Sequence, residues 1–285
     1  MHELLEDMGE IIRLALAEDA VDRDITTLSL IPEHAMGEGS FLVKAPGVIA
    51  GLPIAEAVFL EVDGKVRFET LLPDGSTVRK GEAVATVKGP LASILRAERV
   101  ALNFLQQLSG VATETARYVA AVDGTTAEIL DTRKTTPGLR HLQKYAVQMG
   151  GGRNHRMDLS DGMLVKDNHI AALRARELSL YEITQKALKA TPSGMMVEIE
   201  VTSVAEAEEA MSAGAKLVLL DNMTPDEMRK AVAIAKRHLC KLEASGGITL
   251  ETIRAVAQTG VDFISIGALT HSSKALDISL EVAEV

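Results

Sequence analysis

The chain has 285 residues, 47% of them hydrophobic and 25% charged, and a formal net charge of −10. This is the composition of a soluble globular protein with a sizeable core, and its acidic surface would repel nucleic acid. Aromatic residues make up only 3% of the chain, which disfavours a stacking platform for single strands, and the single Cys240 excludes an intrachain disulfide and a zinc site built on paired cysteines.

The first twenty residues predict an acidic amphipathic helix. Their apolar side chains recur at helical spacing: Leu4, Leu5, Met8, Ile11, Ile12 and Ala15. No basic segment precedes an apolar stretch, so we do not expect a signal peptide. No apolar run approaches the ~18–20 residues of a membrane span. Together with the lone cysteine, these features predict a cytoplasmic protein without a membrane partner.

Residues 38–90 predict short strands, because runs of β-forming residues alternate with turn pairs such as Pro46-Gly47 and Asp63-Gly64. From Asp74 to Gly89 the sequence is similar to the hairpin of lipoyl or biotinyl carrier domains. Such a carrier needs a modifiable lysine at the tip of an exposed turn, and none stands out. We therefore interpret the segment as scaffold and keep a carrier as the alternative.

The next segment predicts one helix from Pro90 to about Ser109, with Gly110 as its end. Its apolar face consists of Leu91, Ile94, Leu95, Ala101, Leu102, Leu105 and Leu108. Arg96 and Arg99 are its cations, and a solvated position is the ordinary explanation for each.

From residue 127 onward, short apolar runs alternate with helical patterns. The apolar runs are residues 127–130, 162–165, 195–199, 217–220, 241–244 and 263–266, and the later helical patterns are residues 203–213, 225–239 and 249–259. This alternation predicts βαβ units with a parallel sheet, and six or more units favour a closed or nearly closed barrel.

Polar residues follow these apolar runs. They are residues 131–134, 166–169, Glu200, residues 221–222, 245–247 and 267–268. In α/β barrels the C-terminal edge of the sheet carries the site. The last two of these ends are glycine-rich, a pattern that suits binding of a phosphate by backbone N–H groups.

Residues 131–170 form a basic island, with seven Lys or Arg and three His against four acids. The island points to an anionic small molecule as ligand. Its strand-end cations are Arg133, Lys134, Arg156 and Lys166. Such groups bind carboxylates and phosphates, while the two acids Glu200 and Asp221 suit Mg²⁺ or the hydroxyls of a sugar. Structural ion pairs are the alternative explanation.

Two histidines of this island, His155 and His169, are candidate metal ligands. No further His, Cys or carboxylate stands at ligand spacing, so we expect His155 to bind an anion or to position its neighbours. Gly150 could be only the C-cap of a helix, but three glycines in a row (150–152) let the backbone approach a ligand closely.

Several long motifs occur in a fixed order over nearly the whole chain. They are Glu98-Arg99-x-Ala-Leu-Asn-Phe-Leu, Asp131-Thr-Arg-Lys-Thr-Thr-Pro-Gly, Gly150-Gly-Gly-x-Asn-His-Arg, Lys166-Asp-Asn-His-Ile, Glu198-x-Glu-Val, Leu220-Asp-Asn and Ala244-Ser-Gly-Gly-Ile. Together they closely resemble the quinolinate phosphoribosyltransferase family, also called nicotinate-nucleotide pyrophosphorylase (carboxylating).

The resemblance implies an α/β fold, with an incomplete, seven-stranded α/β barrel and an N-terminal α/β sandwich. The sandwich would span residues 1–110, with residues 270–285 packing back on it, and the barrel would span residues 111–269. It also implies a homodimer in which Arg99 reaches into the partner's site. The implied reaction transfers phosphoribosyl from phosphoribosyl pyrophosphate to quinolinate with decarboxylation, giving nicotinate mononucleotide in NAD biosynthesis.

The resemblance also assigns site residues. Quinolinate would bind Arg99, Arg133, His155, Arg156 and Lys166; phosphoribosyl pyrophosphate and Mg²⁺ would bind Thr132, Lys134, Glu200 and Asp221; the 5′-phosphate would bind Ser245, Gly246, Gly247, Gly267 and Ala268. Of these residues Lys134, Lys166, Glu200 and Asp221 would be catalytic, with the metal at Glu200 and Asp221. Glu200 is preferred to Glu198 by its spacing to Asp221, although strand alternation places both acids on one face.

Three alternatives remain besides the carrier. A nicotinate-using phosphoribosyltransferase would need fewer cations, because its substrate has one carboxylate. A member of the same family that is encoded beside molybdate transport genes is a second. A barrel aldolase with Lys166 as Schiff-base lysine is the third, and it requires a lysine buried away from other cations.

Overall fold

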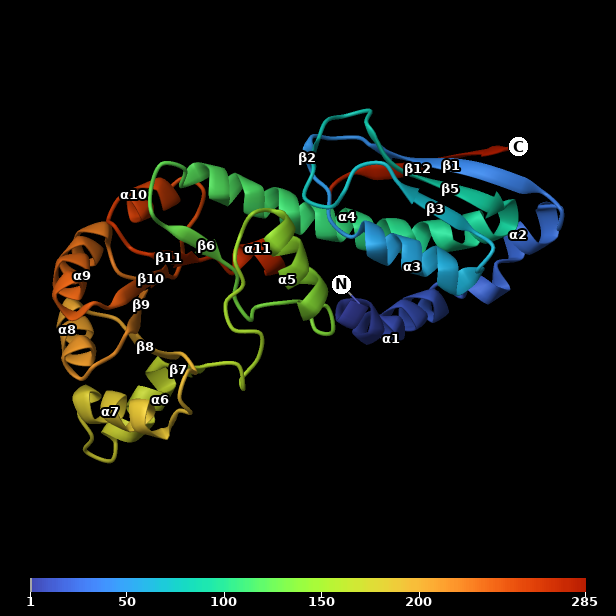
Figure 1. Ribbon diagram of the computed structural model, residues 1–285. Helices are drawn as coiled ribbons and strands as arrows, with labels where there is room; N and C mark the ends of the chain where they lie inside the picture. The colour runs from blue at the N-terminus through green and yellow to red at the C-terminus, as the bar shows by residue number, and fades with distance from the viewer. Residues whose placement is uncertain (1) are drawn as a thin grey trace. The chain divides into compact units, whose positions relative to one another are not determined.

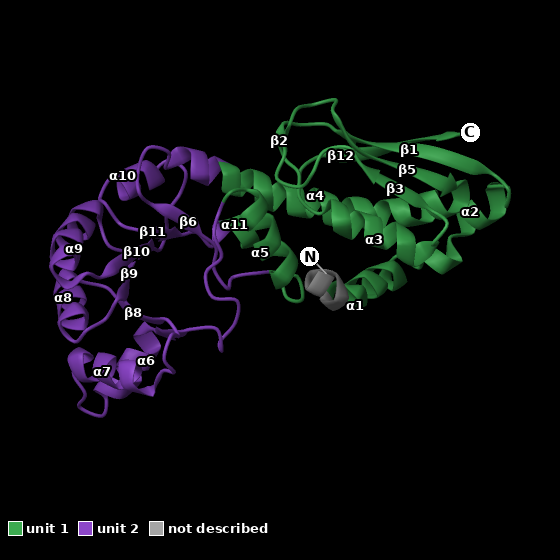
Figure 2. Cartoon of the chain, viewed as in Figure 1, with its two compact units in different colours: residues 1–116, 136–151, 269–285 green, residues 117–135, 152–268 purple. Residues whose placement is uncertain are grey.

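The computed structural model describes residues 2–285, with side chains from residue 8 onward. The chain divides into two compact units (Figure 2). The first contains the residues up to 116 together with 136–151 and 269–285, and the second contains residues 117–135 and 152–268. These compact units are not the same division as the predicted domains 1–110 and 111–269, because α4 runs through residue 110 and residues 136–151 group with the first unit.

The first unit is built on an antiparallel sheet with the order β12-β1-β5-β3 (Figure 1). Its strands are β1 (Met36–Val43), β3 (Arg67–Thr70), β5 (Ala83–Pro90) and β12 (Ile278–Glu284), and β2 (Gly47–Val48) pairs separately with β4 (Thr77–Val78). Its helical segments are α1 (His2–Glu18), η1 (Val21–Arg23), α2 (Ile25–Leu30), α3 (Leu52–Val62), α4 (Leu91–Ala121), which continues into the second unit, and α5 (Arg140–Met149).

Helix α3 was not predicted, because residues 38–90 were interpreted as β-structure throughout. Its buried side chains, such as Ile54, Val58 and Phe59, recur at the three- and four-residue spacing of a helix, and a proline stands in its first turn. Phe59 packs edge-on against Phe41 of β1, with ring centroids 6.0 Å apart. The helix thus covers one face of the sheet.

The segment from Asp74 to Gly89, which is similar to a carrier hairpin, is part of the scaffold, as interpreted from the sequence. Its first strand, β4, pairs with β2, whereas β5 lies inside the four-stranded sheet between β1 and β3. The segment therefore contributes to two different sheets and does not form a separate hairpin.

Helix α4 does not end at Gly110, contrary to the prediction. A Cβ at Gly110 would lie 2.9 Å from the carbonyl carbon of Lys274, so the glycine allows the C-terminal segment to cross the helix at close range. Nearby, Leu276 N donates to the Gln106 carbonyl over 2.9 Å. The glycine is required by this crossing and not by a helix end.

The second unit is an α/β structure with a six-stranded parallel sheet in the order β6-β11-β10-β9-β8-β7. Its strands are β6 (Glu128–Leu130), β7 (Met163–Val165), β8 (Val197–Val201), β9 (Leu217–Asp221), β10 (Lys241–Ser245) and β11 (Phe263–Ser265). The connecting helices are α6 (Asp167–Arg174), α7 (Leu180–Ala190), α8 (Val204–Ser212), α9 (Pro225–His238) and α10 (Ile253–Ala257), and α11 (Ala268–His271) follows β11. Figure 1 shows α8, α9 and α10 along the outer side of the sheet.

The strands of this sheet do not all pair in chain order: the first strand, β6, pairs with the last strand, β11. A seventh strand was predicted, but at its place the described residues have a single parallel bridge, between Leu130 and Arg153. The chain after β6 therefore touches the sheet for one residue before it continues to β7.

Local sequence explains the helix starts of this unit. Ser179 and Thr224 each accept the N–H of a glutamate three residues on, whose side chain returns a hydrogen bond, forming capping boxes for α7 and α9. The cap of α9 starts that helix shortly after β9 ends, whereas the cap of α7 separates it from the preceding helix α6. No helix in the described part of the chain is long and apolar enough to cross a membrane.

Candidate active site

A cavity of about 660 Å³ lies at the carboxyl ends of the parallel strands of the second unit. It is lined by Thr132, Arg133, Lys134, His155, Arg156, Leu164, Lys166, Glu200, Leu219, Asp221, Asn222, Glu243, Ser245, Gly246, Gly247 and Ser265. All six strands of the sheet, or the residues directly after them, contribute to this lining. This is the edge at which α/β barrels and open α/β sheets hold their ligands.

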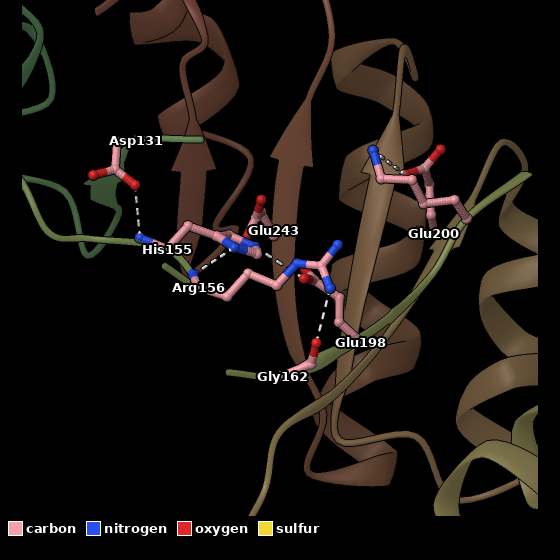
Figure 3. Close-up of polar contacts among 8 residues, drawn as sticks. Asp131, His155, Arg156, Gly162, Glu198, Glu200 and Glu243 are labelled. Atoms are coloured by element: carbon pink, nitrogen blue, oxygen red, sulfur yellow. Dashed lines mark hydrogen bonds and ion pairs between the residues drawn. The ribbon is translucent and has the colours of Figure 1, made fainter. Parts of the chain in front are cut away.

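The four predicted cations all line this one cavity: Arg133, Lys134, Arg156 and Lys166. Arg156 is largely buried, and its Nη1 donates to the Gly162 carbonyl over 2.8 Å (Figure 3). Burial, followed by the charge of Arg133, lowers the pKa of Arg156. Arg133 Nε is buried without a hydrogen-bond partner. A buried donor of this kind is costly unless an acceptor reaches it, so the cavity is arranged to receive an anion.

The two predicted acids, Glu200 and Asp221, also line the cavity, from neighbouring strands β8 and β9. Lys166 Nζ lies 3.8 Å from Glu200 Oε2. Burial raises the pKa of Glu200; the Lys166 charge opposes this effect and the Asp221 charge adds to it. Two neighbouring carboxylates at a cavity offer the oxygen atoms that a hard cation or the hydroxyls of a sugar would contact.

The structure separates Glu200 from Glu198, which the sequence could not do. Glu200 lines the cavity, whereas Glu198 lies two residues deeper on β8, is only 1% exposed and does not line it. The two acids share a face of the strand, as alternation predicts, but they lie at different depths.

Glu198 contacts His155, whose Nε2 lies 3.0 Å from Glu198 Oε2 and 3.5 Å from Glu243 Oε2 (Figure 3). The other ring nitrogen, Nδ1, accepts the backbone N–H of Arg156 over 2.8 Å. Burial alone lowers the pKa of His155, but hydrogen bonds and charges from the two glutamates outweigh it and raise the pKa. Burial also raises the pKa of Glu198. Both ring nitrogens of His155 thus have partners within the protein, and the residue also lines the cavity; its predicted contact with quinolinate stays a prediction.

The loop that carries His155 and Arg156 is attached to the sheet by Asp131. This fully buried carboxylate accepts the His155 backbone N–H over 2.9 Å and Asn154 Nδ2 over 2.6 Å. Asp131 directly follows β6, so a residue outside the cavity sets the position of two residues that line it.

Of the residues predicted to bind a phosphate, Ser245, Gly246 and Gly247 line the cavity, whereas Gly267 and Ala268 do not. Phosphate binding by this group stays a prediction. Gly246 has a left-handed φ of 95°, and a Cβ there would lie 2.5 Å from Asn222 Cγ. Only glycine fits at this position, where backbone N–H groups border the cavity.

Gly150 and Arg99 do not line the cavity. Gly150 is the C-cap of α5, and a Cβ there would lie 2.6 Å from Thr115 Cβ, so it allows α5 to pack closely on α4. Arg99 is exposed on α4 of the first unit and does not line this cavity, so its role stays a prediction.

Sequence reasoning missed Glu243 and Ser265 of the lining, and it named Asn222 only among the polar strand-end residues and set Glu198 aside in favour of Glu200. One signal was present, since Glu198 and Glu243 each stand between two apolar residues within a strand. A charged residue at a core position of a strand is rarely buried without a partner or a task.

Comparison with known proteins adds the family. Two family models match, quinolinate phosphoribosyl transferase N-terminal domain over residues 24–109 and C-terminal domain over residues 111–281. The chain belongs to the quinolinate phosphoribosyl transferase family. Together the two matches span both compact units, so the membership rests on nearly the whole chain and not on the cavity alone.

Individual members of the family are similar over most of their length. The probable nicotinate-nucleotide pyrophosphorylase [carboxylating] of Bacillus subtilis is 43% identical over 93% of this chain and 90% of its own. Quinolinate phosphoribosyltransferase [decarboxylating] 1b of Nicotiana tabacum is 42% identical over 97% and 82%. The crystal structure of NadC from Streptococcus pyogenes superposes with a TM-score of 0.91 and 40% identity, over 98% of this chain and 97% of that one.

Proposed function

We propose that this chain is a quinolinate phosphoribosyltransferase that converts quinolinate and phosphoribosyl pyrophosphate into nicotinate mononucleotide, pyrophosphate and CO₂ in NAD biosynthesis. The observation that carries the proposal is the convergence of Arg133, Lys134, Arg156 and Lys166 in one cavity with Glu200 and Asp221. A substrate pair with two carboxylates and several phosphates needs this density of positive charge. The family names the reaction that such a cavity would carry out.

The guanidinium groups of Arg133 and Arg156 would hold the two adjacent carboxylates of quinolinate, with Lys166 beside them. Both arginines line the same cavity, and the unpartnered Nε of Arg133 supplies a buried donor. A ring fixed in this way presents its nitrogen to the anomeric carbon of the ribose. Positioning of two reactants of this kind can supply several kcal/mol of rate enhancement, about 7 kcal/mol or more in the best cases.

The ring nitrogen then forms a bond to the anomeric carbon, while the bond from that carbon to pyrophosphate breaks. Glu200 and Asp221 would stabilise the positive charge that develops on the sugar, and Lys134 would neutralise the departing pyrophosphate. The ribosylated nitrogen is cationic, and its charge stabilises the electron pair that stays on C2 when the C2 carboxylate leaves as CO₂. A proton from solvent or a cavity acid then replaces CO₂ at C2, so the reaction needs no covalent nucleophile.

Glu200 and Asp221 are oxygen ligands of the kind that Mg²⁺ prefers, and they lie together at the cavity, so we propose them as its protein contacts. The ion would neutralise the phosphates of the second substrate. We further propose the finer features that the resemblance implies: an incomplete barrel, supported by the pairing of β6 with β11, an N-terminal sandwich, a cytoplasmic enzyme, and a homodimer with Arg99 in trans.

The barrel aldolase is a weaker candidate. Lys166 is half exposed and lies beside Glu200, in a cavity with three other cations. A Schiff-base lysine requires burial that favours the neutral amine, and a neighbouring carboxylate has the opposite effect.

The central experiment incubates the purified chain with carboxyl-labelled quinolinate, phosphoribosyl pyrophosphate and Mg²⁺ and measures both products. We expect CO₂ and pyrophosphate in equal amounts. Arg156→Met should weaken quinolinate binding strongly, whereas Arg153→Met is a matched control, because Arg153 lies on the same loop but pairs at the surface with Glu128. Ribosylation of nicotinate with no reaction of quinolinate would favour the nicotinate-using enzyme instead.

The dimer proposal has its own test. Arg99→Ala and Lys166→Ala chains should each be inactive, and mixing them should restore part of the activity if Arg99 acts in the partner's site. Failure to restore activity, with subunit exchange demonstrated by mass-labelled chains, would assign Arg99 another role and leave the central proposal intact.

A further inference from the structure

Asn222 has a backbone conformation that is unusual for its place in the fold. In the described part of the chain, the non-glycine residues with a left-handed φ are Ala20, Glu177, Asn222 and Leu239. Leu239 caps the end of α9, and Ala20 and Glu177 lie in turns that follow α1 and α6, where such a φ is common. Asn222, with a φ of 53°, instead follows strand β9 directly and lines the cavity. A strained residue beside a cavity suggests a functional constraint.

The side-chain amide of Asn222 contacts the acid that precedes it. Its Nδ2 donates to Asp221 Oδ2 over 2.9 Å. A carboxylate has two acceptor oxygens, so this bond leaves Asp221 Oδ1 for a cation or a sugar hydroxyl. The amide thus sets the direction in which Asp221 offers its second oxygen to a ligand.

Asn222 also packs on the glycine turn of the next strand. A Cβ at Gly246 would collide with the amide, 2.5 Å from Asn222 Cγ. The backbone N–H of Asn222 donates to the Ser245 carbonyl over 2.9 Å, which continues the pairing of β9 with β10. One residue is therefore in contact with both the carboxylate of Asp221 and the turn at residues 245–247.

We propose that Asn222 is a positioning residue that holds Asp221 and the turn at residues 245–247 in one arrangement for the phosphoribosyl substrate. The inference rests on the proposed function, in which Asp221 serves the ribose and Mg²⁺ and the turn binds the 5′-phosphate. One ribose phosphate must reach both groups at once. A displacement of about 1 Å between them would slow the reaction, since misplacement on that scale can cost about 100-fold.

Asparagine meets both requirements of this position. It adopts a left-handed backbone more readily than most residues with a Cβ, and its short side chain carries a donor. Glycine would meet the backbone requirement without an amide. Aspartate would meet it with a charge that repels Asp221. These two substitutions therefore separate the backbone role of Asn222 from the role of its side chain.

The first variant is Asn222→Gly, which removes the amide and relaxes the backbone. We expect its unfolding temperature to equal or exceed that of wild type, because glycine adopts this φ without strain. The kcat/KM for phosphoribosyl pyrophosphate should fall by about 10–100-fold, the scale for loss of a contact that orients a metal ligand. The KM for quinolinate should change little, since Arg133 and Arg156 follow β6 and precede β7, away from β9.

Binding is measured separately from turnover. Benzene-1,2-dicarboxylate has two adjacent carboxylates and no ring nitrogen, so it would fill the quinolinate position without reacting. Calorimetric titration of that complex with phosphoribosyl pyrophosphate and Mg²⁺ should show binding weakened by about 10-fold or more in Asn222→Gly. Asn222→Asp keeps the turn and loses the donor, and its added charge repels Asp221, so it should show at least the same loss.

Glu177→Gly is the matched control. Glu177 has a left-handed φ of 63°, is exposed after α6 and does not line the cavity. This variant should keep wild-type kinetics and an unfolding temperature no lower than that of wild type.

The inference is overturned if Asn222→Gly binds and turns over its substrates as wild type does, because the residue would then serve the turn alone. It is also overturned if the loss of activity comes with a lower unfolding temperature or with an equal rise in the KM for quinolinate. Wild-type protein that releases neither CO₂ nor pyrophosphate would refute the proposed function, and this inference with it.

Discussion

The carboxylate of Asp131 accepts the backbone N–H of His155 over 2.9 Å, which ties the loop before Arg156 to the end of strand β6. Asp131 is fully buried, and its other oxygen accepts Asn154 Nδ2 over 2.6 Å. The geometry of a cavity residue, Arg156, thus depends on an acid that does not touch the cavity.

Asp131→Ala should therefore affect both folding and binding. Removing the acceptor leaves two partly buried donors unsatisfied, so we expect the free energy of unfolding to fall by about 2–3 kcal/mol. The KM for quinolinate should rise more than kcat falls, because the displaced Arg156 binds the substrate in the proposed reaction. Urea unfolding and steady-state kinetics measure the two effects, and Asp131→Asn, which keeps one acceptor, should be intermediate. An Asp131→Ala enzyme with wild-type KM would separate the loop from substrate binding.

Glu200→Gln should lower kcat by about 10²–10³-fold, the scale observed when one electrostatic stabiliser of a transition state is removed. The thermal unfolding temperature should change little, because the side chain borders an open cavity. Glu208→Gln is the matched control, since that acid is exposed on α8. If Glu198→Gln lowers kcat while Glu200→Gln does not, the assignment of the functional acid to Glu200 is wrong.

Gly110→Ala should destabilise the first unit by about 3 kcal/mol or more, toward the upper end for overpacked sites. The new methyl would collide with the backbone of Lys274, which a side-chain rotation cannot relieve. Gly64→Ala is the control, because nothing lies within 4 Å of a Cβ there. Denaturant unfolding and limited proteolysis of the last residues compare the two variants, and equal stabilities would contradict the close crossing.

Cys240 should resist alkylation in the folded protein. Burial raises the pKa of its thiol from 9.0 to about 12, so the folded state binds a proton that the unfolded state releases near pH 9. The neutral thiol stabilises the fold fully below pH 9.0, and this contribution is lost as the pH rises toward 12. Iodoacetamide labelling at pH 8 and pH 10, with and without denaturant, measures the protection; equally fast labelling of folded and unfolded chains at pH 10 would refute it.

The parallel sheet and its polar edge were predictable because they depend on local patterns. Apolar runs followed by polar residues placed Arg133, Lys166, Glu200 and Asp221 at strand ends, and the structure brings these four to one cavity. The course of the chain after β6 was not predictable. This segment is held by the side chain of Asp131 and by a single bridge at Arg153, contacts that no periodicity records.

Long-range contacts explain the remaining differences. Gly110 has the ordinary sequence signature of a helix end, yet α4 continues because the C-terminal segment needs the space that a side chain would fill. Glu198 and Glu243, which contact His155, lie 43 and 88 residues from it in the sequence, so no regular spacing of residues could reveal these contacts. Function predicted from motifs was accurate here because the motifs mark strand ends, where the fold gathers residues without regard to their distance along the chain.

Strand β1 is central in the first sheet, with β5 on one side and the last strand, β12, on the other. The pairing runs from Gly37 with Glu284 to Val43 with Ile278. During translation β1 therefore emerges with one open backbone edge, which stays uncovered until residues 278–284 have been synthesised. Premature termination near residue 275 would leave that edge permanently available to other nascent chains, so even a short loss at the carboxyl terminus should cause aggregation of the truncated product.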